Sequence, residues 1–175
     1  TAGFLKDLAQ APWAQRVQYH FKDEGQRADL MQLLPDYAPG QHVYTCGAPR
    51  FMDGVFEAAT AHSWPQDAMH REYFSVPEAD AWVNQAFELV LQKSGRRLSV
   101  SAERSATEVL AEAGLGISVK CSDGLCGVCA LPYDAQASDP VEHRDFVLSQ
   151  KERQHKIILC CSRAQQAGGV IRLDF

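Results

Sequence analysis

Three cysteines lie close together between Cys121 and Cys129, with the spacing C-x4-C-x2-C. A regular helix or strand over this stretch could not direct all three thiols to one point, so the stretch must be a loop that wraps around a ligand. Gly124 and Gly127 lie between the thiols, where the backbone has to turn tightly and approach the ligand closely. Thiolates suit soft metals, and the loop therefore predicts either a zinc site or an iron–sulfur cluster.

The cysteine spacing favours the cluster. Zinc sites usually use two separate C-x2-C clips, whereas the plant-type 2Fe–2S centre uses C-x4-C-x2-C and one distant cysteine. Two candidates for the distant cysteine, Cys160 and Cys161, follow an apolar run that predicts a buried strand. In a strand only one of two adjacent thiols can face the cluster. A zinc clip, a reduced cysteine cluster and a disulfide framework are the alternatives.

The segment from Cys121 to Arg163 resembles the C-terminal ferredoxin domain of Rieske-oxygenase reductases, of the phthalate dioxygenase and vanillate demethylase reductase type. In that family x-Ser-Arg follows the last ligand, which selects Cys160 and leaves Cys161 as a small buried residue. The family's His-Arg-Asp-x-x-Leu-Ser segment is present as His143–Ser149. The spacing and the resemblance together imply these ligands of one 2Fe–2S cluster: Cys121, Cys126, Cys129 and Cys160.

The first part of the chain has the order of apolar segments and turns that is typical of an α/β layer. Alternating apolar residues predict strands over 16–21 and 42–46, and apolar residues at helical spacing predict a helix over 51–62. Short helices are expected over 4–11 and 29–34. The order of strand, loop and helix predicts a βαβ layer with a parallel sheet.

The stretch Tyr44–Met52 resembles the Cys-Gly-Pro-x-x-Phe-Met signature of ferredoxin–NADP reductases, although Ala48 stands where that family has proline. The resemblance implies that Cys46 is a catalytic residue beside the nicotinamide; an inert thiol at the strand end is the alternative. Phe74 matches an aromatic residue that abuts the flavin, or else it fills a gap between domains. The resemblance implies these cofactor-binding residues: Gly47, Pro49, Phe51, Met52 and Phe74.

The ferredoxin part predicts a β-grasp fold. Strands are expected over 87–92 and 97–100 with Gly95 in the turn between them, then a helix capped by Ser105 and Glu108, and further strands over 128–133 and 170–175. Residues 1–70 contain no glycine-rich phosphate loop. The family's flavin-binding β-barrel and the first half of its nucleotide-binding domain have no counterpart, so the chain resembles the C-terminal portion of a reductase.

The predicted fold class is an α/β partial nucleotide-binding domain of the ferredoxin–NADP reductase type, followed by an α+β β-grasp ferredoxin domain. The predicted boundaries are 1–74 for the C-terminal half of the NAD-binding domain, 75–85 for a linker and 86–175 for the ferredoxin domain.

The composition limits the kinds of partner that the sequence predicts. Hydrophobic residues make up 46% of the chain and the net charge is −5, with no basic patch that would predict nucleic acid or an anionic membrane as a partner. No apolar run has the length of a membrane span and the first residues lack a signal-peptide pattern, so a cytoplasmic location is expected.

The resemblance implies an enzyme that passes electrons from NAD(P)H through FMN to the 2Fe–2S cluster and on to a terminal oxygenase. We expect this chain alone to lack the flavin-binding part. The alternatives are a stand-alone ferredoxin-like carrier with a non-catalytic docking domain and a zinc-stapled interaction module. Some of the acids near the cysteine loop are expected to steer the oxygenase: Asp123, Asp134, Asp139, Glu142 and Asp145.

Overall fold

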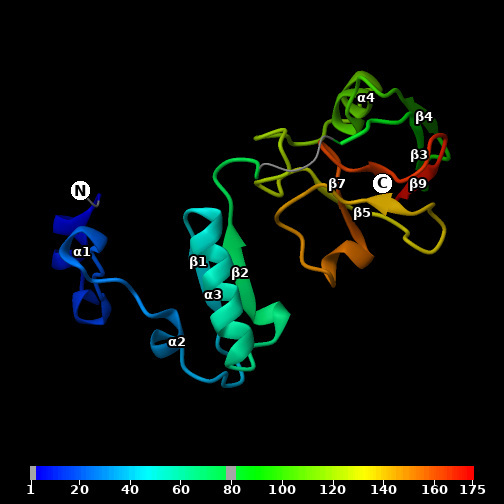
Figure 1. Cartoon of the computed structure of the whole chain (residues 1–175). Helices are drawn as coiled ribbons and strands as arrows, with labels where there is room; N and C mark the ends of the chain where they lie inside the picture. The colour runs from blue at the N-terminus through cyan, green and yellow to red at the C-terminus, as the bar shows by residue number, and fades with distance from the viewer. Residues whose placement is uncertain (1–2, 78–81) are drawn as a thin grey trace.

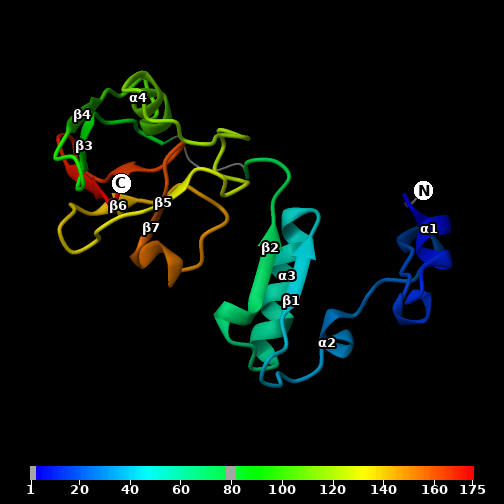
Figure 2. The same cartoon turned by 180° about the vertical axis from the view of Figure 1, so that it is seen from behind.

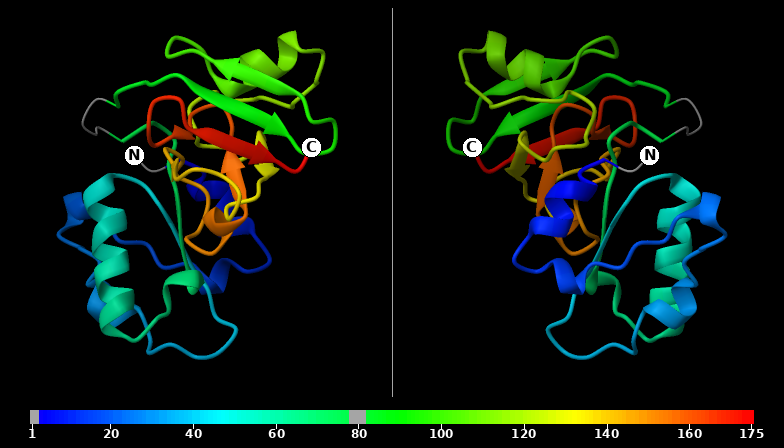
Figure 3. Two further views of the ribbon diagram at one scale, coloured as in Figure 1. Left: turned by 90° about the vertical axis from the view of Figure 1, so that its right-hand side faces the viewer. Right: turned by 90° about the vertical axis from the view of Figure 1, so that its left-hand side faces the viewer.

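The computed structural model describes residues 3–77 and 82–175. Its two main units are a helix-and-strand unit around α3 and a second unit around β3, β4 and β9 (Figure 1). The view from behind shows α1 at the far end of the first unit, away from the second (Figure 2). The side views show the two units one above the other (Figure 3).

The first unit is a small βαβ layer. Its elements are α1 (Leu5–Gln10), η1 (Ala14–Arg16), η2 (Lys22–Glu24), α2 (Leu30–Leu33), β1 (Val43–Cys46), α3 (Pro49–Ala61), η3 (Gln66–Ala68) and β2 (Met69–Glu72). Strands β1 and β2 are parallel neighbours, with Tyr44 opposite His70. Pro49 starts α3, where its fixed φ suits the first helical position. A cluster around Ala59, Trp64 and Ala68 packs this helix against the strands.

The expected strand over 16–21 is wrong. Residues 17–21 follow a 3₁₀ turn and lie in no strand, although the rings of Tyr19 and Phe21 do stack on one side, 6.0 Å apart. Alternation favours a strand only where a neighbouring strand supplies hydrogen bonds, and none lies alongside these residues in the described part of the chain. The second strand of the layer is β2 instead, whose sequence Met-His-Arg-Glu lacks a strand-like pattern.

The second unit has the elements expected of a β-grasp domain. They are β3 (Phe87–Leu91), β4 (Arg97–Val100), α4 (Ala106–Glu112), β5 (Ala130–Pro132), β6 (Val141–Glu142), η4 (Glu152–Gln154), β7 (Lys156–Ile158), β8 (Arg163–Ala164) and β9 (Val170–Leu173). Strand β3 is central, antiparallel to β4 and parallel to β9. The core includes Leu89 and Ile171 from the sheet and Leu110 from α4, all fully buried.

Local signals in this unit are confirmed. Gly95 has φ +69° in the β3–β4 turn, and its N–H donates to the Leu91 carbonyl at 2.8 Å. Ser105 and Glu108 form the capping box at the start of α4. Gly114, also with positive φ, follows the helix. No helix in residues 3–77 and 82–175 is both long enough and apolar enough to cross a bilayer.

Replacing Ser105 with alanine removes the acceptor for the Glu108 N–H, now 3.3 Å from Ser105 Oγ. We expect the free energy of unfolding to fall by about 1 kcal/mol, the usual contribution of such a cap. Urea denaturation of the full chain measures it. The control is Ser75→Ala, outside every helix and strand, which should change stability by less than about 0.5 kcal/mol. Equal losses in the two variants would contradict the capping role.

Candidate metal centre

The cysteine loop lies between α4 and β5 and contains no regular element. Three of its residues have positive φ: Ser122 at 64°, Gly124 at 73° and Gly127 at 72°. Left-handed positions make the backbone turn tightly. Glycine adopts them most easily, which explains why two glycines lie between the cysteines. The loop therefore has the tight curvature that its sequence predicts.

The four predicted ligands form two pairs. Cys121 lies within hydrogen-bond distance of Cys126, and Cys129 lies within the same reach of Cys160, which also contacts Cys161. Within the described ranges, no three His, Cys, Asp or Glu side chains gather around a single ion position. A tetrahedral zinc site needs four donors around one ion, whereas a 2Fe–2S cluster presents two irons that each take two thiolates. The paired donor set fits the cluster.

The backbone around the thiols favours negative charge on sulfur. Burial opposes ionisation of Cys121, but N–H groups of Asp123, Leu125 and Cys126, together with the Cys126 thiol, lower its pKa to about 7. The N–H of Gly124 likewise hydrogen bonds to Cys160. Hydrogen bonding with Cys160 and burial raise the pKa of Cys129, and a bound metal would overcome this by its own charge. The loop is thus suited to hold thiolates.

Cys160 and Cys161 lie in a turn after β7 rather than in the expected strand, so the argument from alternating faces is wrong here. Cys160 lies within hydrogen-bond reach of both Cys129 and Cys161, and the sulfur of Cys161 also packs against Gly124. A Cβ on Gly124 would meet Cys161 Sγ at 2.7 Å and the Cα of Asp145 at 3.1 Å. Only glycine fits this point, because of both its φ and the lack of space.

Asp145 supports the loop from inside the domain. Its side chain is 0% exposed, and its carboxylate accepts the N–H groups of Val147 and Leu148 at 3.3 and 2.8 Å. Arg153 lies 3.4 Å and His143 3.7 Å from it. Burial raises the pKa of Asp145, but His143, the Leu148 N–H and Arg153 outweigh burial and leave the pKa lowered.

The burial of Asp145 corrects the expectation that it steers a partner from the surface. Three of the other acids are also engaged: Asp134 caps a turn at Gln136, Asp139 accepts the Val170 N–H, and Glu142 pairs with Arg144. Asp123 is exposed in the cysteine loop itself. The sequence pattern does not identify Asp145 as a supporting residue, and the His-Arg-Asp segment is the signal that points to it.

Only some of the residues predicted to bind the nicotinamide and the flavin lie close together in the structure. Cys46 is exposed at the end of β1, and Gly47 follows with φ 145°. A Cβ on Gly47 would lie 3.4 Å from the ring of Phe51, on the first turn of α3. Met52 is buried in the interior, unlike its neighbours. Phe74 is 81% exposed, so the alternative that it fills a gap between domains is wrong.

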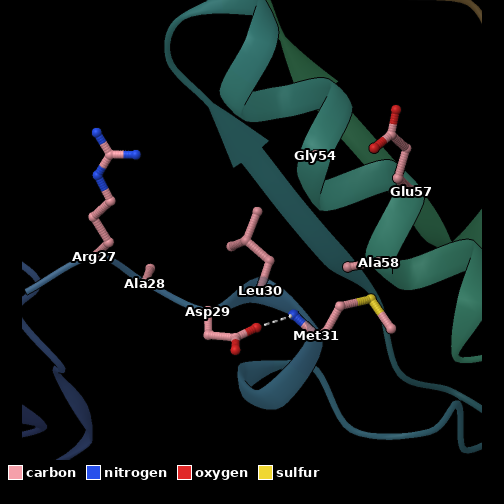
Figure 4. A pocket seen from close by; sticks show the side chains of 8 residues that line it. All are labelled: Arg27, Ala28, Asp29, Leu30, Met31, Gly54, Glu57 and Ala58. Atoms are coloured by element: carbon pink, nitrogen blue, oxygen red, sulfur yellow. Dashed lines mark hydrogen bonds between the residues drawn. The ribbon is translucent and has the colours of Figure 1, made fainter.

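A separate open pocket of about 450 Å³ lies between α2 and α3 (Figure 4). Its walls include Leu30, Met31 and Gly54, and its charged side chains are Arg27, Asp29 and Glu57. None of the residues predicted to bind a metal or cofactor lines it. Its shape follows from the short α2 packing on α3, where a Cβ on Gly54 would meet Leu30 at 3.2 Å.

A β-grasp unit with a loop of paired thiols defines a 2Fe–2S ferredoxin domain. Residues 89–165 match the family model of the 2Fe–2S iron–sulfur cluster binding domain. Over most of its length the chain is similar to reductase components of oxygenase systems.

Three proteins show the extent of this similarity. The vanillate O-demethylase oxidoreductase of Acinetobacter baylyi is 31% identical over 91% of this chain and 50% of that protein. The structure of phthalate dioxygenase reductase, described as modular for electron transfer from pyridine nucleotides to [2Fe–2S], is 32% identical with a TM-score of 0.55, over 97% of this chain and 52% of that one. An intact type IV self-sufficient cytochrome P450 monooxygenase is 34% identical with a TM-score of 0.72, over 98% of this chain and 22% of that one.

The chain spans about half the length of the curated relatives it matches. The predicted fold class, a partial reductase-like α/β unit followed by a ferredoxin domain, is confirmed by these matches. The domain boundaries predicted from the sequence stay predictions.

Replacing Gly124 with alanine should damage the loop far more than the same change at Gly95. Both glycines have positive φ, but only at Gly124 would the new Cβ meet other atoms within 4 Å. We expect Gly95→Ala to cost about 1 kcal/mol, and Gly124→Ala about 3 kcal/mol because overpacking adds to the backbone strain. Urea denaturation and iron content of the purified chain measure both effects. Full iron content and a small stability loss in Gly124→Ala would contradict the close packing.

Replacing Asp145 with asparagine tests the buried carboxylate. We expect a loss of about 2 kcal/mol at pH 7, because Arg153 and two N–H groups lose a charged partner. The pKa of Asp145 is lower in the folded chain than its unfolded value of about 3.9. Its contribution is therefore complete above about pH 4 and is lost as the pH falls toward the folded pKa. The stability gap between wild type and variant should narrow below pH 4 in denaturation curves; a constant gap would contradict the ionic role.

Proposed function

We propose that Cys121, Cys126, Cys129 and Cys160 hold one 2Fe–2S cluster, and that the chain acts in an oxygenase reductase that takes electrons from NAD(P)H through FMN to this cluster. The single observation that supports it most is the arrangement of the thiols in two pairs, Cys121 with Cys126 and Cys129 with Cys160. When bound, such a cluster accepts and releases one electron at a time. The terminal oxygenase is the proposed partner.

The loop's own atoms would do three things. The N–H groups of Asp123, Leu125 and Cys126 stabilise thiolate charge on Cys121. Gly124, which is buried, brings the backbone close to Cys160. The burial of Cys129 keeps water from its sulfur. Fewer hydrogen bonds to sulfur would lower the reduction potential, because the reduced cluster carries more negative charge.

The carboxyl end of β1 is the proposed site where the nicotinamide lies next to the flavin. The carboxyl ends of parallel strands beside a helix N-terminus form the usual ligand site of such sheets. Cys46 is exposed at this end, and Gly47, Pro49 and Phe51 follow it into α3. In this proposal Cys46 lies beside the nicotinamide and the exposed ring of Phe74 covers the flavin. Met52 supports the site from the interior.

The second candidate is a stand-alone electron carrier whose first unit only docks a partner. The exposed apolar side chains of Tyr44, Phe51 and Phe74 on this unit favour it, because they offer a surface on which a partner can dock. Reduction of the cluster by NADH in the presence of FMN would distinguish the reductase from this carrier. A cytoplasmic location is also proposed, since the chain's cysteines are free thiols suited to a reducing compartment.

The test of the cluster is anaerobic reconstitution of the full chain with iron and sulfide, followed by serine replacement at single cysteines. We expect two irons per chain, a red-brown visible spectrum and, after one-electron reduction, an EPR signal. Cys160→Ser should lose most of the bound iron, because Cys160 pairs with Cys129. Cys161→Ser is the matched control and should keep it, since its sulfur faces Gly124. A colourless chain that binds one zinc, or iron retained by Cys160→Ser and lost by Cys161→Ser, would overturn the assignment.

A further inference from the structure

The two units meet at a cleft of about 570 Å³ that residues of both units line. The first unit supplies Phe56, Arg71 and Tyr73, and the second supplies the stretch 145–151 and Arg153. Across the cleft the rings of Tyr73 and Phe146 lie 5.2 Å apart at an interplanar angle of 61°. This edge-to-face geometry is the favourable one for two aromatic rings.

Tyr73 is held firmly on its own side. The guanidinium of Arg71 donates to Tyr73 Oη and to the carboxylate of Asp53, each at 3.0 Å. The same guanidinium lies 3.9 Å from the centre of the Phe56 ring. Asp53 and Phe56 belong to α3, so the position of Tyr73 is tied to the main helix of the first unit.

Phe146 is held just as firmly by the cysteine loop. Its N–H donates to the carbonyl of Gly124 at 3.1 Å. The preceding residue, Asp145, is buried against Gly124, and its carbonyl accepts a hydrogen bond from Arg153 at 2.7 Å. Phe146 therefore cannot move without the loop that carries Cys121 and Cys126.

Two arginines of the ferredoxin unit bind residues 82–85, where the chain enters that unit. Arg144 donates to Asn84 Oδ1 at 2.6 Å and to the Val83 carbonyl at 3.0 Å, and its guanidinium lies 5.1 Å from the Trp82 ring. Arg163 donates to the Gln85 carbonyl at 3.1 Å. Residues 82–85, expected to be part of a linker, are thus fixed to the ferredoxin unit.

We propose that residues 143–149 are the positioning element between the two units, with Phe146 placing the cysteine loop against Tyr73 while Arg144 fixes the incoming chain. The inference rests on the proposed function, because electron transfer between a flavin and a cluster falls steeply with their separation. The two units are joined at two points, by the covalent chain and by the aromatic pair. Two joints keep the units at a defined separation, which a single flexible connection does not. Phe146 and Tyr73 are positioning residues, and neither needs to touch a cofactor.

The test measures the separation directly. A nitroxide is attached to Glu57→Cys, an exposed position on α3, in a background that carries Cys46→Ser and Cys161→Ser, and pulsed dipolar EPR records its distance to the reduced cluster. We expect one narrow distribution in the parent chain and at least a twofold wider one in Tyr73→Ala and in Phe146→Ala. The double variant should be no wider than either single one, because both changes remove the same contact. Tyr73→Phe keeps the ring but loses the hydrogen bond from Arg71, so it should widen the distribution less than Tyr73→Ala does.

Controls separate positioning from a general loss of structure. Tyr73 lies outside the ferredoxin unit, so Tyr73→Ala should leave the cluster's visible spectrum and reduction potential unchanged. Val76→Ala, at an exposed side chain of the same connection, is the matched control and should leave the distribution narrow. A broad distribution in the parent chain, or an unchanged width in both alanine variants, would overturn the inference.

Small-angle X-ray scattering of the same variants needs no cluster. We expect the maximum dimension to grow in Tyr73→Ala and Phe146→Ala but not in Val76→Ala, and no growth would overturn the inference. A chain that takes up no iron would refute the proposed function, while the scattering would still decide whether the aromatic pair joins the units.

Discussion

The packing of Gly124 against Asp145 and Cys161 is the constraint on which the candidate site depends. The backbone comes so close at this point that a single added carbon would lie 2.7 Å from a sulfur. The carboxylate of Asp145, buried without exposure, is stabilised by two N–H groups and by Arg153. Such a buried charge is costly unless its partners are in place, so the loop and its supporting segment form or fail together.

This arrangement explains how a loop without regular structure presents thiols in a defined way. Its curvature comes from three residues with positive φ, and its position comes from contacts with a segment that follows later in the chain. The N–H groups released by the curl then point at sulfur instead of at carbonyls. The same atoms that shape the loop thus supply the electrostatic environment that thiolates need.

The first unit depends more on its neighbours. Its sheet has two strands, its buried cluster is small, and several large apolar side chains are exposed on it, among them Tyr44, Phe51 and Phe74. Sheets of this size are marginal alone. The expected strand over 16–21 failed for a related reason, since alternation without a pairing partner does not make a strand. The contact between Tyr73 and Phe146 ties this unit to the better-packed ferredoxin unit.

The sequence by itself determined the features that depend on near neighbours: the cysteine spacing, the glycines at positive φ, the capping box of α4 and the β3–β4 turn. Each is decided within a few residues by backbone sterics or local hydrogen bonds. The tertiary structure alone decided which thiols pair, that Cys160 and Cys161 lie in a turn, that Asp145 is buried, and that Phe146 meets Tyr73. These depend on contacts between residues far apart in the chain, and no local pattern encodes which distant side chain will fill a given space.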